Sequence, residues 1–338
     1  MNEYRTVLIT GITGSFGTAM LQHMLRTTTC TIRGLSRSEL LQAQLRETLT
    51  QEERARVRLL LGDIRDYQRL IVAMHDVDVV WHAAALKRVD SGEYNPIEFT
   101  RTNIYGTEQV IAACIASGVK KAVLLSSDKS VSPCNLYGAT KMVAERLWVR
   151  ANSYSPYGTH FIATRYGNVT GSRGSVFDVW RRHREAGTPL PITHPAMTRF
   201  WITLDEAVQL AQFASLHGPR GSILIPQLEA YTVTDLAQAY GGEHVETVDV
   251  GIRPGEKMHE TLIAAHEASR LSMWRGENRV APKYYAIAPE DPSWHQPPSF
   301  GITWEPYPLL DAYESGQWPY RLDTATLREQ LRDLGIVI

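Results

Sequence analysis

The chain has 338 residues, 43% of them hydrophobic and 21% charged, which suits one large domain or two intimately joined domains with a sizeable core. Its formal net charge of −1 gives no electrostatic reason to expect nucleic acid as a partner. Three scattered cysteines lack metal or redox spacing, so we expect no metal site. No signal peptide precedes the first predicted strand and no apolar run approaches the ~18 residues of a membrane-spanning helix, so we expect a soluble, cytoplasmic protein without membrane contact.

The first element is a buried strand at residues 5–10, followed at once by a glycine-rich turn and a helix at 15–26. The glycines are Gly11, Gly14 and Gly17. Glycines at this spacing allow a tight turn and let the backbone approach a pyrophosphate at the helix N-terminus. A structural turn would share the glycines, but the strand before them and the helix after them favour dinucleotide binding.

The second strand, at 30–35, leads into Ser36, Arg37 and Ser38. An NAD site usually offers an acid here to the ribose hydroxyls, whereas a guanidinium and two hydroxyls suit a 2′-phosphate. The segment therefore favours NADP, with NAD possible because a neutral pocket does not exclude it, and Arg37 could also be an ordinary solvated arginine. Asp63, after the third strand, is placed to meet the adenine or to cap the next helix.

Strands and helices alternate through about residue 165, which predicts an α/β protein with a Rossmann-type, doubly wound parallel sheet covered on both faces. The further strands are expected at 57–61, 78–81, 121–126 and 160–165, and the further helices at 38–48, 66–74, 103–118, 137–154 and 205–214. Glycine and proline break up the chain after residue 166. We expect a dinucleotide-binding domain over 1–166 with a returning segment at about 198–225, and a smaller C-terminal substrate-binding lobe made of 167–197 and 226–338.

The most informative segment follows the fifth strand. Ser127, Asp128 and Lys129 come at the strand end, and Tyr137 and Lys141 stand on the next helix as Tyr-x-x-x-Lys. A hydroxyl at a strand end with Tyr-x-x-x-Lys is how a nicotinamide enzyme removes an alcohol proton. The additional acid and amine have no use in simple alcohol oxidation, but removal of water from a carbon chain requires both. A surface ion pair is the alternative for Asp128 and Lys129, and their position between strand and helix argues against it.

Several longer segments resemble the extended short-chain dehydrogenases/reductases, and specifically the soluble, inverting UDP-N-acetylglucosamine 4,6-dehydratases. The resemblance spans residues 5 to about 265. The segments that carry it are 10–17, 82–87, 93–96, 135–141, 165–169, 171–175, 197–203 and 251–257. The last two, Met-Thr-Arg-Phe-Trp-Ile-Thr and Gly-Ile-Arg-Pro-Gly-Glu-Lys, are the most specific. One position departs from the family, which usually has threonine where this chain has Ser127.

The resemblance implies NADP-dependent dehydration of UDP-N-acetylglucosamine to a UDP-4-keto-6-deoxy-hexosamine. In this scheme Tyr137 takes the proton of the 4-hydroxyl, Ser127 orients that hydroxyl, Lys129 removes the proton of carbon 5 and Asp128 protonates the departing 6-hydroxyl. Lys141 is expected to hold the Tyr137 phenol near ionisation. Lys129 must then be neutral, through burial and the nearby Lys141 cation, and Asp128 must be protonated in a dry site.

The cofactor and the substrate are expected to contact two partly overlapping sets of residues. By motif and resemblance, the cofactor is expected to contact Gly11, Thr13, Gly14, Ser15, Phe16, Gly17, Ser36, Arg37, Asp63, Ile64, Ala83, Ala84, Lys87, Tyr137 and Lys141. The substrate is expected to contact Lys87, Asn168, Arg199, Arg253 and Glu256. The last three could instead serve structural ion pairs.

The resemblance also bears on stereochemistry and assembly. Retaining relatives are typically longer, anchored to membranes and have methionine in place of the tyrosine, so Tyr137 favours inversion at carbon 5. The product would have the L-arabino configuration and would feed pseudaminic acid or a related surface glycan. Relatives form dimers or hexamers, so we expect a homo-oligomer. Two alternatives stay open: a UDP-sugar 4-epimerase of the same fold, and a non-catalytic cofactor-sensing protein.

Overall fold

The computed structural model describes residues 4–155, 158–172, 174–274, 283–291, 303–307 and 311–336. Its largest feature is a ten-stranded sheet in the order β15-β13-β14-β9-β6-β5-β4-β1-β2-β3. Seven neighbouring strands, from β3 to β9, pair in parallel, and the sheet continues from β9 through three antiparallel pairings. The strands are β1 (Thr6–Thr10), β2 (Thr31–Ser36), β3 (Val57–Leu61), β4 (Val79–His82), β5 (Lys121–Leu125), β6 (His160–Thr164), β9 (Ile223–Pro226), β13 (Leu271–Trp274), β14 (Tyr284–Ile287) and β15 (Glu305–Pro306). The predicted α/β class with a parallel sheet is confirmed.

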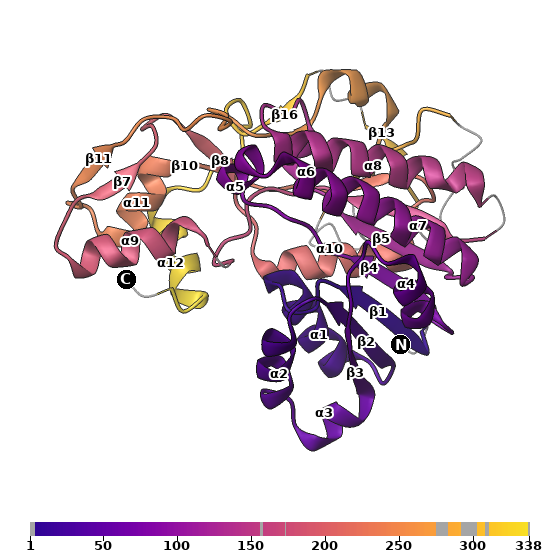
Figure 1. The fold of residues 1–338 in the computed structure, drawn as a ribbon. Coiled ribbons are helices and arrows are strands. Elements are labelled where there is room, and N and C mark those ends of the chain that lie inside the picture. The colour runs from indigo at the N-terminus through magenta and orange to yellow at the C-terminus, as the bar shows by residue number, and fades with distance from the viewer. Residues whose placement is uncertain are drawn as a thin grey trace.

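Helices cover both faces of this sheet, as Figure 1 shows. One face carries α4, α7 and α8, which pack against one another, and the other carries α1 and α10. These and the smaller helices of this part are α1 (Ser15–Thr27), α2 (Glu39–Glu47), α3 (Gln51–Arg56), α4 (Tyr67–Met74), α5 (Val89–Tyr94), α6 (Pro96–Phe99), α7 (Gly106–Ala116), α8 (Leu136–Tyr154) and α10 (Leu204–His217). Buried strands such as Val79–His82, with no exposed residue, explain why the sequence shows continuous apolar runs here.

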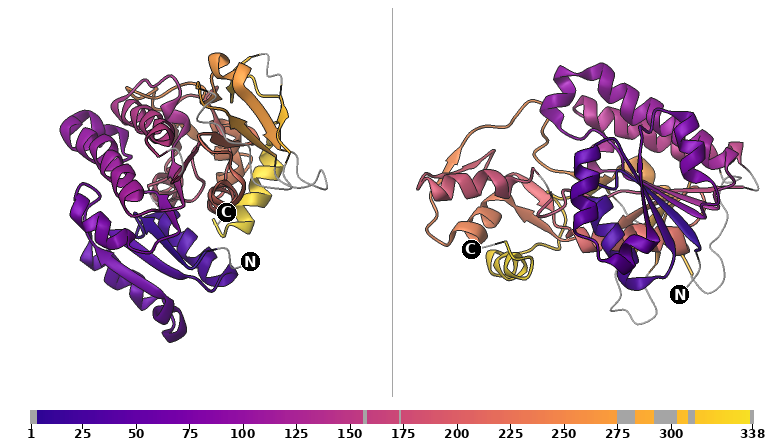
Figure 2. Two further views of the ribbon diagram at one scale, coloured as in Figure 1. Left: turned by 90° about the vertical axis from the view of Figure 1, so that its right-hand side faces the viewer. Right: turned by 60° about the horizontal axis from the view of Figure 1, so that its bottom comes forward.

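A smaller lobe lies beyond one end of the strands, as the right-hand view of Figure 2 shows. Its own apolar core centres on Trp180, Tyr231 and Leu327. Its elements are α9 (Val176–Glu185), β7 (Leu190–Ile192), β8 (Thr198–Phe200), β10 (Ala230–Thr232), α11 (Val233–Gly241), β11 (Thr247–Asp249) and α12 (Thr324–Asp333). A separate two-stranded pair joins β12 (Thr261–Ile263) to β16 (Tyr313–Glu314).

Two expectations need correction. The predicted helix at 103–118 is α7 preceded by a π-helical segment at Thr100–Tyr105, so regular α-helix begins three residues later than predicted. The predicted lobe at 226–338 also contains β13, β14 and β15, which belong to the large sheet. We therefore propose the two domains as predicted from the sequence, except that β13, β14 and β15 belong to the dinucleotide-binding domain and not to the smaller lobe.

Candidate active site

The site begins where β5 ends and the chain makes a short 3₁₀ turn at Asp128–Ser130. The Ser127 hydroxyl caps this turn by accepting a hydrogen bond from the backbone N–H of Lys129, at 3.3 Å. Helix α8 then packs directly on the turn. Gly138 permits this close approach, since a Cβ at that position would lie only 2.3 Å from the Lys129 carbonyl oxygen. Glycine at this position is therefore what brings Tyr137 to the strand end.

The side chains at the strand end form one hydrogen-bonded group. The Ser127 hydroxyl donates to Oδ1 of Asp128 at 2.8 Å. The Lys129 amine lies 3.2 Å from the same oxygen and 2.7 Å from Oδ1 of Asn168. Asp128 is buried, and 22% of the Lys129 side chain is exposed, so the pair is not a surface ion pair. The structure thus places Asn168 beside the predicted base.

A second carboxylate, which the sequence analysis missed, completes this group. Oε1 of Glu260 lies 3.3 Å from the Lys129 amine and 3.8 Å from Nε of Arg199. Glu260 comes three residues after the motif that ends at Lys257, and that closeness is the signal that could have identified it. The structure therefore joins the loop before β12 to the turn after β5.

Burial and neighbouring charges set the protonation of the group. Burial raises the pKa of Asp128 and Glu260 adds to the rise, which agrees in direction with the prediction of a protonated acid. Burial acts to lower the pKa of Lys129, but Asp128 and Glu260 outweigh it and raise that pKa above its ordinary value. The expectation that burial and Lys141 together lower the pKa of Lys129 is therefore wrong, because the acidic side chains of Asp128 and Glu260 face the amine. Burial also raises the pKa of Tyr137.

Lys141 is buried one turn further along α8, and its amine donates to the carbonyl oxygen of Leu125 at 2.7 Å. Burial lowers its pKa to about 8, and the opposing influence is Glu145. The cation that acts to lower the pKa of Tyr137 is Lys129 and not Lys141, which was expected from the sequence. Glu145 in turn forms a buried ion pair with Arg165.

The glycine turn after β1 fits the pyrophosphate of a dinucleotide. Gly11 has φ of +73°, and a Cβ there would lie 2.9 Å from the backbone nitrogen of Ala84. A Cβ at Gly17 would lie 2.3 Å from the Gly11 carbonyl oxygen. Gly14 is the N-cap of α1 and has no side chain that could cap the helix, so an anion can approach this helix end closely. The backbone of this turn is therefore a cradle that side chains would fill.

The segment after β2 is more ambiguous than the sequence suggested. Arg37 lies 3.9 Å from Asp63, and the half-exposed guanidinium can still turn toward a ligand. Asp63 accepts a closer contact from Arg65, at 2.7 Å, and hydrogen bonds from Arg65 outweigh burial to lower its pKa. Ser38 caps α2. Asp66 rather than Asp63 caps α4, so the capping alternative for Asp63 is wrong.

Of the predicted substrate residues, Asn168 and Arg199 lie beside the catalytic group, and Arg253 and Glu256 lie on the loop before β12. Arg199 is buried next to the catalytic group, and its Nη1 donates to the carbonyl oxygen of Thr198 at 2.7 Å. Arg253 is exposed on the loop before β12, and its backbone N–H donates to Glu256 at 3.3 Å. That loop is fixed to the start of α8 by a hydrogen bond between Asn135 and the Gly255 carbonyl oxygen, at 2.7 Å. Lys87 is the remaining candidate, and burial lowers its pKa.

Other polar residues near the site are structural. The amide of Asn103 bonds both backbone groups of Leu86, at 2.8 and 2.9 Å, which holds the segment after β4. His82 is buried, stacks on Trp148 with centroids 5.4 Å apart, and contacts the Thr107 hydroxyl at 3.1 Å. Burial lowers the pKa of His82 to about 3, so it is a neutral core residue.

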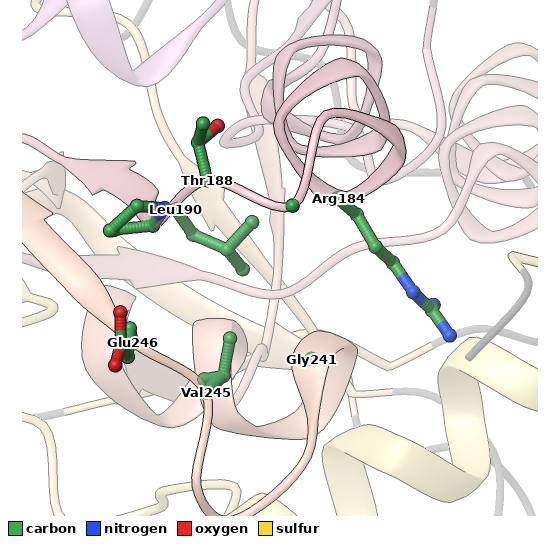
Figure 3. A pocket seen from close by; sticks show the side chains of 8 residues that line it. Arg184, Thr188, Leu190, Gly241, Val245 and Glu246 are labelled. Atoms are coloured by element: carbon green, nitrogen blue, oxygen red, sulfur yellow. The ribbon is translucent and has the colours of Figure 1, made fainter.

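A separate hollow of about 270 Å³ lies in the smaller lobe (Figure 3). It is lined from α9, β7 and the end of α11 by Arg184, Gly187, Thr188, Pro189, Leu190, Gly241, Val245 and Glu246. None of the predicted catalytic residues lines it. Among the residues that the structure describes, no group of three or more His, Cys, Asp or Glu side chains could hold a metal ion.

Comparison with known proteins identifies the family. The model of the polysaccharide biosynthesis protein family matches residues 7–279. The chain belongs to this family. It is 43% identical over 303 residues to the UDP-N-acetylglucosamine 4,6-dehydratase (inverting) of Campylobacter jejuni serotype O:23/36, covering 88% of this chain and 87% of that protein. It is also 36% identical to a UDP-glucose 4-epimerase of Rickettsia prowazekii, covering 98% and 97% of the two chains.

Solved structures agree with the family assignment. The X-ray structure of Pen from Bacillus thuringiensis superimposes with a TM-score of 0.85 at 33% identity, covering 99% of this chain and 98% of that one. DesIV, the dTDP-glucose 4,6-dehydratase of Streptomyces venezuelae, shares the fold with a TM-score of 0.66 at 22% identity. The expected short-chain dehydrogenase/reductase fold is thereby confirmed. In the described part of this chain, no helix has the length and apolar character needed to cross a membrane.

Proposed function

We propose that this protein is an inverting UDP-N-acetylglucosamine 4,6-dehydratase that uses a nicotinamide cofactor. The similarity to the Campylobacter jejuni dehydratase supports the substrate and the reaction class. The observation that carries the proposal is the buried contact between Asp128 and Lys129, at 3.2 Å, beside Tyr137. An acid and an amine placed together at the end of β5 are the two groups that an elimination of water needs.

The residues divide the reaction between them. Tyr137 accepts the proton of the 4-hydroxyl, and the Ser127 hydroxyl orients that group. The bound nicotinamide supplies reversible hydride acceptance, from carbon 4 and back to carbon 6. Lys129 accepts the carbon 5 proton and Asp128 gives its proton to the departing 6-hydroxyl, which leaves as water. Tyr137 and Lys129 then hold one abstracted proton each. Carbon 5 regains one proton on the face opposite to the one that Lys129 deprotonated, which inverts its configuration, and the other proton restores Asp128, so the protons balance.

For the cofactor, we propose NADP, held by Arg37 at the ribose phosphate and by the glycine turn at the pyrophosphate. The half-exposed guanidinium 3.9 Å from Asp63 supports this choice, because Arg65 already pairs with that carboxylate. DesIV, of the same fold, contains NAD in its solved structure, so NAD is the competing cofactor. Calorimetric titration with each cofactor distinguishes them.

The substrate's sugar and diphosphate are proposed to contact Lys87, Asn168, Arg199, Arg253 and Glu256. Asn168 and Arg199 reach the catalytic group, and Arg253 lies on the exposed loop next to α8. We also propose a homo-oligomer, either dimer or hexamer, and a place in pseudaminic acid or related surface-glycan synthesis. Light scattering of the purified protein tests the assembly.

The second candidate is a UDP-sugar 4-epimerase, which the Rickettsia relative's name favours. One experiment separates the two. The protein is incubated with UDP-N-acetylglucosamine, and the product is examined by mass spectrometry and NMR. A dehydratase lowers the product mass by one water molecule and gives the L-arabino 4-ketone, whereas an epimerase leaves the mass unchanged. Tight cofactor binding without turnover would instead indicate a cofactor-sensing protein.

A further inference from the structure

The backbone of Glu260 is fixed by two hydrogen bonds, although this residue lies outside the motif at residues 251–257. Its backbone N–H donates to the Ser315 hydroxyl at 2.9 Å, and its carbonyl oxygen accepts from the Ser315 N–H at 2.8 Å. Its carboxylate is buried, with 3% of the side chain exposed. Among the described residues, Oε2 has no hydrogen-bond partner. A buried charge this well fixed needs a reason, because burial alone disfavours it.

Three side chains place oxygen atoms around the Lys129 amine. These atoms are Oδ1 of Asn168 at 2.7 Å, Oδ1 and Oδ2 of Asp128 at 3.2 and 3.5 Å, and Oε1 of Glu260 at 3.3 Å. An ammonium group has three N–H donors and no acceptor, so three acceptor side chains match its charged form. To act as a base, Lys129 must give up one of these three protons. Of the three partners, Asn168 is uncharged and Asp128 is adjacent to Lys129 in the chain. Glu260 is therefore the charged partner that the tertiary fold brings to the amine.

We propose that Glu260 is a positioning residue for the elimination, which anchors the Lys129 amine beside Asp128 and sets the pH range in which that amine serves as the base. This inference rests on the proposed dehydratase function. The carboxylate favours the protonated amine, so Lys129 becomes a base at higher pH than it would without Glu260. In return, the amine is held at one place by two acidic side chains rather than by one.

The charges around the pair support this direction. Arg199 and Lys257 both act to lower the pKa of Glu260, so its carboxylate stays ionised despite burial. Arg199 also acts to lower the pKa of Lys129. The titratable and charged groups that face the pair are Asp128, Tyr137, Arg199, Tyr231 and Lys257, together with His259 beside Glu260 in the chain. Without the Glu260 charge, Lys129 would therefore face Arg199 with Asp128 as its single acidic partner among these groups.

The first test measures the titration of Lys129 directly, in a chain with seven lysines. Protein labelled with ¹³C at the lysine ε-carbons is titrated by NMR, and the Lys129 signal is assigned from its absence in Lys129→Met. In Glu260→Gln, which keeps the shape and removes the charge, the midpoint should fall by ~1 pH unit or more. The control Glu246→Gln removes the same charge from the exposed end of the smaller lobe and should leave the midpoint unchanged. An unchanged or higher midpoint in Glu260→Gln overturns the proposal.

A second variant works in the opposite direction. Asn168→Asp places a new carboxylate at the position of an amide oxygen that lies 2.7 Å from the amine, and it should raise the midpoint. The double variant should return toward the wild-type midpoint. If Glu260→Gln does not fold, Glu260→Asp is titrated instead: its carboxylate is further from the amine, so the midpoint should fall by a smaller amount, and an unchanged midpoint overturns the proposal.

Rates give the functional arm. The acidic limb of the kcat profile for water loss should move to lower pH in Glu260→Gln with KM nearly unchanged, and Glu260→Asp should restore part of the wild-type profile. A kcat limb that stays in place overturns the proposal. If the Lys129 midpoint falls in Glu260→Gln as expected but the wild-type protein releases no water from the substrate, the dehydratase function is refuted instead.

Discussion

Replacing Lys141 with methionine should make the protein more stable at neutral pH while it removes a residue proposed for catalysis. Methionine is close in length to lysine and carries no charge to bury. The Lys141 amine is buried on α8 and donates to the Leu125 carbonyl oxygen at 2.7 Å. The nearest compensating charge is Glu145, which Arg165 already engages. Lys141 is therefore a cation with incomplete compensation.

The magnitude follows from the pKa of Lys141. Burial lowers this pKa from its ordinary 10.5 to about 8. Each tenfold change in proton affinity is worth ~1.4 kcal/mol, so keeping the charged form buried costs about 3 kcal/mol below the folded-state pKa. Methionine avoids this cost but leaves the Leu125 oxygen without that donor, at about 1–3 kcal/mol. The variant should gain on the order of 1 kcal/mol at neutral pH.

The pH dependence is the sharper part of this prediction. Between the folded pKa of about 8 and the ordinary 10.5, the unfolded chain binds more protons at Lys141 than the folded chain. Wild-type stability therefore rises with pH across that window, relative to the variant. From about pH 7 to about pH 9.5, the relative gain is about 2 kcal/mol, so the wild type should become the more stable protein.

Urea unfolding of both proteins at a series of pH values measures the difference, and other titrating groups cancel in the comparison. Lys283→Met, at a half-buried lysine outside the site, is the matched control for loss of a lysine side chain. A Lys141→Met variant that is less stable at neutral pH, by an amount that does not change as the pH rises, would refute the reasoning.

Three further predictions concern the cofactor turn and the buried ions. Gly17→Ala should weaken cofactor binding by roughly tenfold or more, ~1.4 kcal/mol, because its Cβ would lie 2.3 Å from the Gly11 carbonyl oxygen; calorimetry measures it, and unchanged affinity contradicts it. Arg37→Ala should reduce NADP affinity by roughly tenfold and leave NAD affinity unchanged, and equal losses would argue against the NADP assignment. Arg165→Met leaves two buried glutamates without their cation and should cost about 3–5 kcal/mol in urea unfolding; a loss below ~1 kcal/mol would contradict this.

The sequence predicted six of the seven parallel strands to within one residue at each end, and β9 (Ile223–Pro226) was not predicted. Strands such as Thr6–Thr10 and His160–Thr164 have buried apolar residues at their centres, which is what burial between two layers of helices requires. It did not predict β14, a fully buried strand of four residues at Tyr284–Ile287. Its pairing with β9 depends on contacts between distant segments, and a run that short does not distinguish a strand from a loop.

The same contrast holds for the site. Ser127, Asp128 and Tyr137 were predicted as site residues because they share one local pattern, and the structure brings them together through α8 packing on the turn. Glu260 was missed because its partner is far away in the chain and only the tertiary fold joins them. The protonation of Lys129 could not be predicted either, since its pKa depends on that distant carboxylate.

The charges at the end of β5 also separate the two candidate reactions. Relatives named as a dehydratase and as an epimerase are both similar to this chain over most of its length, so the fold alone does not distinguish them. An epimerase needs the Tyr137 phenol and its lysine. It has no use for Asp128, Lys129 and Glu260, whose burial costs several kcal/mol per ion before their mutual attraction offsets it. Apolar side chains at these three positions would not carry this free-energy cost of burial. The presence of the charged groups is therefore best explained by an elimination that uses them.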